Sequence, residues 1–123
     1  MNKVLTITAT IGALTIILGA FGAHALKDVL SVNELKSFET GVRYQMYHVL
    51  VLLFINTYSK FSKKTKNTIS YLFLAGILFF SGSIYAIALG VSSKAIWYVT
   101  PLGGLFFVLG WIILGISFFK MKS

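Results

Sequence analysis

The sequence predicts an all-α protein, a four-helix transmembrane bundle with antiparallel neighbours. Hydrophobic residues make up 57% of its 123 residues and charged residues only 11%, whereas a soluble domain carries roughly 25% charged residues. The apolar residues fall into four runs, each about long enough to cross a bilayer. Polar, lysine-containing segments separate these runs. We expect one multi-pass membrane domain over 1–123, with spans at about 4–23, 40–59, 68–89 and 100–119.

The first apolar run, 4–23, carries no charge and is long enough for a ~30 Å hydrocarbon core. A signal peptide is the alternative, because Lys3 precedes the run and the A-H-A at 23–25 has the form of a cleavage site. The run is longer than the apolar part of most signal peptides, and its removal would leave an odd number of spans. We therefore expect the segment to be retained. Gly19 and Ala23 form a small-xxx-small pair, which allows a neighbouring helix to approach closely.

The second helix is predicted to begin outside the membrane. Ser31 and Glu34 have the spacing of a capping box, in which each side chain bonds to the backbone of the other residue. Leucines at 30 and 35 occupy the positions of a hydrophobic staple. No proline interrupts the helix before about Tyr58. Its first turns should therefore extend beyond the hydrocarbon region.

The remaining connectors bound the third and fourth spans. A lysine-rich segment, 56–67, reads as a solvated loop, and 90–94 as a turn. Trp97 and Tyr98 suit the aromatic belt at a membrane surface. Thr100 is predicted as an N-cap, because a proline follows it at the first helical position.

The basic residues predict the orientation of the bundle. With four spans, the termini and the second connector share one side, which holds seven lysines: Lys3, Lys60, Lys63, Lys64, Lys66, Lys120 and Lys122. The other side holds all three acids with Lys27, Lys36, Arg43 and Lys94. This excess predicts that both termini lie in the cytoplasm. Topology thus explains the net charge of +8, so the lipid bilayer is the expected partner and nucleic acid is not.

Polar residues on the spans are predicted to gather in one leaflet. At ~1.5 Å per helical residue above the basic side, they all fall in the outer half of the membrane, and the inner half is almost purely apolar. In one bundle, these side chains would converge in an outward-facing, partly hydrated pocket. The candidate binding residues are His24, Glu39, Arg43, Tyr44, Gln45, His48, Ser81, Ser83, Tyr85 and Thr100.

Two interpretations of this cluster stay open. In the structural one, Glu39 neutralises Arg43 four residues later, and the tyrosines and His48 bond to neighbouring helices. In the functional one, the pocket binds a small polar or anionic group, with Arg43 as its anchor and His48 as a titratable neighbour.

The residues carry no motif for catalysis, a metal or a cofactor. The absence of cysteine excludes disulfides and thiolate sites, and no histidine pair has helical metal-binding spacing. His24 and His48 differ by ~13 Å in predicted height, whereas the two ligands of one haem lie at similar height. A haem shared between subunits is the remaining redox alternative. A channel would need polar groups along its whole path. We expect no enzyme, cofactor or metal.

Four separated motifs resemble one known family. They are Gly19-Ala20-Phe21-Gly22-Ala23-His24, Tyr44-Gln45-Met46-Tyr47-His48, Ala75-Gly76-Ile77-Leu78-Phe79-Phe80-Ser81-Gly82-Ser83 and Thr100-Pro101-Leu102-Gly103-Gly104. Together they are similar to domain-of-unknown-function family number 423, also known as uncharacterised protein family 0382, whose mitochondrial relatives are grouped as transmembrane protein 256. The resemblance covers essentially the whole chain. It implies a multi-pass protein of the bacterial inner (cell) membrane with its first segment retained, and it brings no established activity, cofactor or catalytic residue.

The function expected first is a non-enzymatic accessory or structural membrane subunit. A homo-oligomer or a larger membrane complex would help such a small bundle to bury its glycine-rich faces. The alternative is a small-molecule binder or transporter that uses the outer-half pocket around Arg43 and His48. A redox or haem-linked membrane subunit is the third hypothesis.

Overall fold

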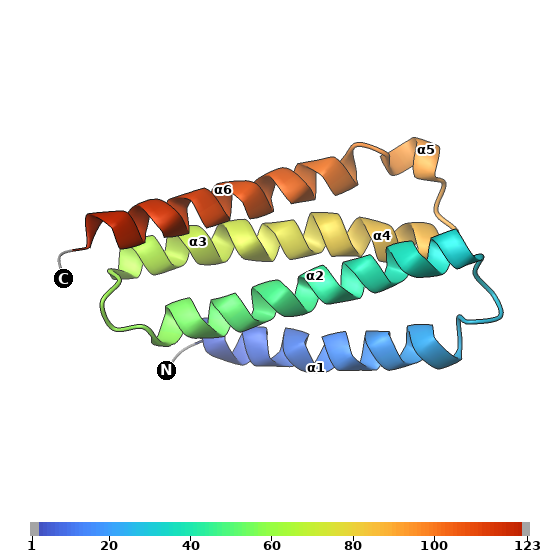
Figure 1. The fold of residues 1–123 in the computed structure, drawn as a ribbon, viewed down its shortest axis with the longest axis horizontal. Helices are drawn as coiled ribbons and strands as arrows, with labels where there is room; N and C mark the ends of the chain where they lie inside the picture. Colours follow the sequence, from blue (N-terminus) through green and yellow to red (C-terminus); the bar gives the residue numbers. More distant parts are fainter. Residues whose placement is uncertain (1–2, 122–123) are drawn as a thin grey trace.

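The computed structural model describes residues 3–121, which form helices joined by short connectors, with no strand among them. The elements are α1 (Lys3–His24), α2 (Val32–Thr57), α3 (Lys63–Gly76), the π-helical turn η1 (Ile77–Ser81), α4 (Gly82–Ala88), α5 (Ser93–Ile96) and α6 (Val99–Lys120). Because α3, η1 and α4 follow one another without a break, four long rods lie antiparallel to their neighbours (Figure 1). The predicted all-α four-helix bundle is confirmed.

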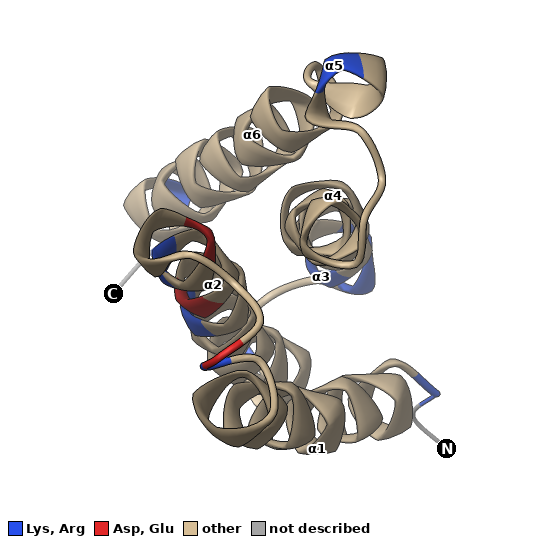
Figure 2. Ribbon diagram, turned by 90° about the vertical axis from the view of Figure 1, so that its right-hand side faces the viewer, with Lys and Arg blue, Asp and Glu red and all other residues tan. Residues whose placement is uncertain are grey.

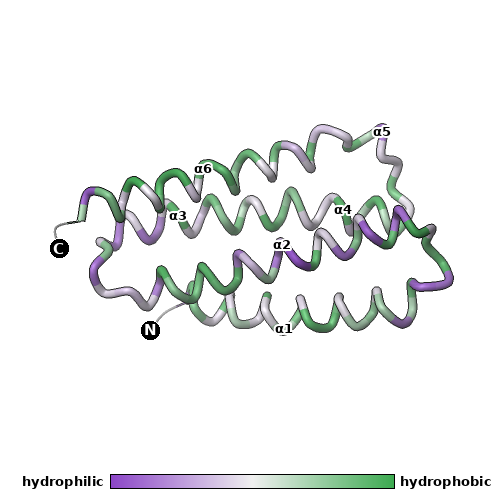
Figure 3. Tube along the Cα trace, viewed as in Figure 1, coloured by the Kyte–Doolittle hydropathy of each residue, from purple (hydrophilic) through white to green (hydrophobic). Residues whose placement is uncertain are grey.

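Three of the four rods suit the hydrocarbon of a membrane. The segments Lys3–His24, Lys63–Ala88 and Ser93–Lys120 are long and apolar enough to cross it. The rod formed by α2 falls short in hydropathy, because polar residues crowd the half nearer Val32 (Figure 3). This helix nevertheless lies within the bundle, with α1 on one side and the rod of α3, η1 and α4 on the other (Figures 1 and 2).

The two ends of the bundle differ in charge. The start of α1, the end of α6 and the α2–α3 connector lie together at one end (Figure 1). Among the described residues, the lysines of that end are Lys3, Lys60, Lys63, Lys64, Lys66 and Lys120. All the acids of the chain belong to the opposite end, on α2 and the connector before it (Figure 2). Lys122, counted with the first side above, lies outside the described residues.

The helix α6 packs tightly against α3 and η1 through glycines that admit phenylalanine rings. A Cβ atom on Gly110 would lie 2.4 Å from the Phe73 ring, and one on Gly76 would lie 2.3 Å from the Phe107 ring. At Gly103 the added Cβ would lie 2.2 Å from the backbone nitrogen of Phe80. Both rings are buried and belong to the hydrophobic core that α2, α3, η1 and α6 share. This half of the molecule therefore interlocks along its length.

The helix α1 packs chiefly on α2, and more loosely. A Cβ atom on Gly12 would lie 3.3 Å from Val49, and one on Gly19 would lie 3.4 Å from Val42. Only Gly22 faces a closer neighbour, because its Cβ would lie 2.6 Å from the Phe38 ring. The close passage of α2 by Gly19 agrees with the small-xxx-small pair seen in the sequence.

Helix starts differ from the sequence predictions at two places. The capping box at the start of α2 is confirmed: the Ser31 N–H donates to the Glu34 carboxylate at 2.8 Å, and the Glu34 N–H donates to the Ser31 hydroxyl at 3.1 Å. The third rod begins at Lys63 rather than near 68, because Ser62 caps it by accepting from the Thr65 N–H. The fourth begins at Val99, so the prediction of Thr100 as its N-cap is wrong.

Candidate functional site

A hydrogen-bonded chain centred on Gln45 joins three helices. The Gln45 side chain of α2 is buried, and its amide nitrogen donates to the Thr15 hydroxyl of α1 at 2.8 Å. The Tyr85 hydroxyl of α4 donates to the Gln45 amide oxygen at 2.6 Å. Thr15 in turn donates to the Ile11 carbonyl at 2.7 Å. Amide and hydroxyls are therefore satisfied by one another, as buried polar groups must be in an apolar surrounding.

The imidazole ring of His48, on α2, packs against α6, and both of its nitrogens form hydrogen bonds. Its Nδ1 lies 2.6 Å from the Tyr44 backbone carbonyl, which can only accept, so Nδ1 carries the proton. Its Nε2 then accepts from the Trp111 indole N–H at 3.0 Å. The ring stacks on Phe107 at a centroid distance of 3.7 Å and meets the edge of Phe73 at 4.9 Å. Both ring nitrogens are occupied, so neither offers a lone pair to a haem iron or another metal.

Three hydroxyls join the π turn and α4 to their neighbours. Ser81 donates to the Gly41 carbonyl of α2 at 2.7 Å. Ser83 donates to the Phe80 carbonyl at 3.0 Å and shares a hydrogen bond with the Thr100 hydroxyl of α6. The Thr100 side chain thus bridges helices instead of capping one. These contacts bring six of the predicted site residues into buried or partly buried positions between helices: Gln45, His48, Ser81, Ser83, Tyr85 and Thr100.

The other four predicted residues do not join this network. His24 is exposed at the end of α1. The exposed Tyr44 ring stacks on Phe80 at a centroid distance of 5.1 Å. Glu39 and Arg43 are exposed on α2, and in the part of the chain that the structure describes no ion pair joins them. The single pocket expected from the sequence is therefore divided into a filled network and a separate charged face.

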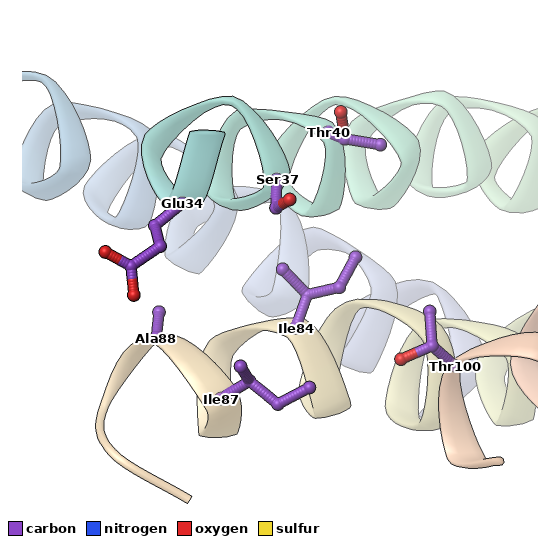
Figure 4. Close-up of a pocket in the computed structure, with 7 residues that line it drawn as sticks. All are labelled: Glu34, Ser37, Thr40, Ile84, Ile87, Ala88 and Thr100. Carbon is purple, nitrogen blue, oxygen red and sulfur yellow. The ribbon is translucent and has the colours of Figure 1, made fainter. Parts of the chain in front are cut away.

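Two of the hollows near the acidic end of the bundle border α2. One of about 350 Å³ separates α2 from α4 and is lined by Glu34, Ser37, Thr40, Ile84, Ile87, Ala88 and Thr100 (Figure 4). Its Glu34, Thr40 and Thr100 side chains already bond to Ser31, the Lys36 carbonyl and Ser83. The other, of about 310 Å³, lies between α1 and α2 and is lined by Gly19, Gly22, Ala23, Phe38, Glu39, Val42 and Arg43. Of these two, only the second presents charged groups that have no partner within residues 3–121.

Several polar contacts were missed from the sequence. Asn56 was assigned to a solvated loop, yet it is buried in α2, and its amide donates to the Ser70 hydroxyl of α3 at 2.9 Å. This contact lies in the half expected to be almost purely apolar. The predicted extension of the helix to about Tyr58 was the available signal for placing Asn56 inside it. Thr15 and Trp111 carried no signal beyond their place in apolar runs. Thr8 is buried, and its hydroxyl has no partner in residues 3–121.

The described residues hold no cluster of three or more histidine, aspartate or glutamate side chains suited to a metal ion. The helices are apolar, and in their interior the amides bond to hydroxyls while the His48 imidazole bonds to the Trp111 indole. Such a fold defines an α-helical integral membrane protein with several membrane-spanning segments.

Comparison with known proteins places this membrane protein in a family. The family model described as "Protein of unknown function (DUF423)" matches residues 18–104, and the chain belongs to this family. It is 40% identical over 122 residues to a UPF0382 membrane protein of Haemophilus influenzae, which covers 99% of this chain and 98% of that protein. UPF0382 membrane proteins of Staphylococcus aureus and Staphylococcus saprophyticus are 43% and 44% identical, over 85% and 84% of this chain and 85% of each relative. No solved structure matches the chain. The family resemblance read from the motifs is confirmed.

Proposed function

We propose that this chain is a non-enzymatic accessory or structural subunit of the bacterial inner membrane. One observation carries the proposal: the buried polar side chains of residues 3–121, apart from Thr8, form hydrogen bonds across helices. The Gln45 amide reaches Thr15 and Tyr85, and both His48 nitrogens are engaged. A catalytic site would need a nucleophile, acid or base left open to a substrate. This network supports an interior that holds the bundle together.

The proposed topology has four spans and cytoplasmic termini. The crossing of α2 is supported by its place within the bundle and by the apolar side chains that it exposes in its second half, Leu50 and Phe54 among them. A polar stretch inside a span is tolerated where it faces protein, as Gln45 and His48 do. The lysine-rich end of the bundle is the end that the positive-inside rule assigns to the cytoplasm.

The proposed partners bind the outer faces of the bundle. Large apolar side chains of α1 point away from α2: Ile7, Leu14, Ile17 and Phe21 are 45–62% exposed. Lipid satisfies such side chains, and so does another transmembrane helix. Because α1 is covered on one side only by its own chain, its other side is free to meet a second copy or a subunit of a larger complex.

A site-specific crosslinking experiment in native membranes tests this role. A photoreactive residue at Ile17 on the outer face of α1 should give a discrete protein adduct. One at Thr8 on the α2-facing side serves as the matched control and should give only intramolecular products, because Thr8 is buried. His48→Ala and Gln45→Ala should lower accumulation of the protein in the membrane. The proposal fails if Ile17 yields only lipid adducts and both alanine variants accumulate normally while small-solute uptake changes.

The second candidate function, a small-molecule binder or transporter, now depends on a different place. The contacts of His48 leave it no open nitrogen, so a pocket around His48 and Arg43 together has no support. The hollow that Glu39 and Arg43 line between α1 and α2 is the observation that favours a binding role.

A further inference from the structure

The hollow between α1 and α2 holds two opposite charges that do not pair with each other. Glu39 precedes Arg43 by four residues, the order and spacing that favour a helical ion pair. Within residues 3–121, the Arg43 guanidinium nevertheless has neither an ion-pair nor a hydrogen-bond partner. Gly19, Gly22 and Ala23 form the opposite wall of the hollow, and their small size leaves the space open. Both charged groups are therefore available to a ligand.

The hollow lies at the level of the membrane surface. Gly19 to Ala23 are the last turns of α1, a rod apolar enough to span the bilayer, and α2 continues from there outward to Val32. Side chains lean toward the N-terminus of their helix, which for Arg43 is the direction of the headgroups. A guanidinium at the edge of the hydrocarbon is costly without an anionic partner, and residues 3–121 place none in contact with Arg43.

From this arrangement we infer that the hollow binds the headgroup of phosphatidylethanolamine, with the phosphate on Arg43 and the ammonium on Glu39. The guanidinium fork matches a phosphate in a bidentate way. Glu39 lies one helical turn, ~6 Å, nearer to water than Arg43. The lipid has the same order, because its phosphate adjoins the glycerol and acyl chains and its ammonium lies beyond a two-carbon linker. A purely anionic lipid would place no cation against Glu39.

The surface below the hollow accommodates acyl chains. One to two turns deeper, Ile16 on α1 and Leu50 on α2 are 64% and 58% exposed and continue the stripes that carry Ala23 and Arg43. The hollow of about 310 Å³ is at the lower end of ligand pockets, ~300–1,000 Å³. The headgroup therefore occupies the hollow while the chains lie along the outside of the two helices. This site is independent of the accessory role proposed above.

The test is lipid retention by the purified protein. The full chain is equilibrated in nanodiscs of equal phosphatidylethanolamine and phosphatidylglycerol, extracted gently, and its bound lipids are measured by native mass spectrometry. The wild type should retain phosphatidylethanolamine preferentially. Loss of a charge-assisted phosphate contact corresponds to about tenfold weaker binding, so Arg43→Gln should reduce retention of both lipids about tenfold. Glu39→Gln should shift the retained ratio toward phosphatidylglycerol, and the matched surface control Lys36→Gln should leave it unchanged.

An additional variant and a competition with inorganic phosphate complete the experiment. Arg43→Lys retains the charge without the fork, so it should keep phosphatidylethanolamine more weakly than the wild type and more strongly than Arg43→Gln. Tryptophan emission, which senses the Trp111 bond to His48, checks that each variant is folded. Excess inorganic phosphate should not displace the lipid. The inference is overturned if folded Arg43→Gln retains lipid like the wild type, if Glu39→Gln leaves the lipid ratio unaltered, or if inorganic phosphate empties the site.

Discussion

The α3–η1–α6 interface and the α1–α2 interface are built by different means. Between the α3–η1 segment and α6, phenylalanine rings fill the space that glycines leave, and a Cβ on Gly76, Gly103 or Gly110 would lie within 2.4 Å of a neighbour. Between α1 and α2, the Cβ positions of Gly12 and Gly19 are 3.3 and 3.4 Å from valine side chains, and Gly22 alone meets a phenylalanine ring closely, at 2.6 Å. The α3–η1–α6 interface is tightly interlocked, whereas the α1–α2 interface is smoother and leaves a hollow open.

This difference indicates where the chain resists change and where it tolerates it. In a bilayer, helix association relies on close packing and interhelical hydrogen bonds rather than on the hydrophobic effect. The α3–η1–α6 side has close packing in abundance. The α1 side has less, so its hydrogen bond from Gln45 to Thr15 carries more of the association. The variants below test this division, from the largest expected effect to the smallest.

Gly103→Ala should be the most damaging single substitution. Its methyl group would meet the backbone nitrogen of Phe80, which cannot rotate away as a side chain can. We expect a loss of about 3 kcal/mol or more of stability, measured as a lower melting temperature in detergent and reduced membrane accumulation. Gly115→Ala is the matched control on the same helix, because nothing lies within 4 Å of its added Cβ. Equal melting temperatures for the two variants would contradict the interlock.

Gln45→Ala should come next. The substitution strands the Tyr85 hydroxyl and removes the partner of Thr15, at a cost of about 1–3 kcal/mol. Thr15→Val in the Gln45→Ala background should add little, because the two residues act as one unit. Thermal unfolding of the single and double variants measures this coupling. Strictly additive losses would show that the chain of hydrogen bonds is not a unit.

Gly19→Ala should be nearly neutral. Its added methyl group would make an ordinary 3.4 Å contact with Val42, so we expect a change within about 0.5 kcal/mol. The same melting-temperature assay measures it beside Gly110→Ala, whose methyl group would lie 2.4 Å from Phe73. A loss at Gly19 as large as that at Gly110 would remove the distinction between the α1–α2 and α3–α6 interfaces.

The capping box of α2 should give the smallest effect, confined to one helix end. The Ser31 backbone and side-chain hydrogen bonds hold the pKa of Glu34 below its usual 4.5. The folded state therefore favours the carboxylate, so its contribution is present above the ordinary pKa and is lost as pH falls through the lower folded value. The protection factors of the amides in the first turn of α2, which correct the exchange rates for their intrinsic pH dependence, should fall below about pH 4.5, and Glu34→Gln should abolish that fall. Protection factors that stay constant in acid would contradict this account.

Most of the fold followed from local rules, and the site followed only in part. Apolar run length predicted the helices, and the spacing of Ser31 and Glu34 predicted the start of α2, because capping depends on neighbours in sequence. The π turn was not predicted, since no residue type specifies one. Thr100 was misread because a threonine before a proline looks like a cap, whereas a tertiary partner, Ser83, takes its hydroxyl.

The sequence predicted how far along each helix the polar residues lie. It did not predict the direction in which each residue faces around the helix axis. Gln45, Tyr85 and His48 were expected among the outer-half polar groups, and the structure joins each of them to a neighbouring helix. Arg43 was grouped with them by height, yet it points into a different hollow. Arg43 and Gln45 are two residues apart and therefore lie on nearly opposite sides of α2. The sequence alone does not show which neighbouring helix each of these sides faces.

The wide turn at Ile77–Ser81 makes α3 and α4 two halves of one rod that are out of phase by a single residue. Each residue of an α-helix advances ~100° around its axis. If Ile77–Ser81 formed a plain α-helix with no residue removed, the α4 half would be rotated by about that angle. Ser83 and Tyr85 would then turn away from Thr100 and Gln45, while Phe73 would keep its contact with Gly110. The extra residue in the turn therefore determines which side chains of α4 face Thr100 and Gln45, without altering the α3 half.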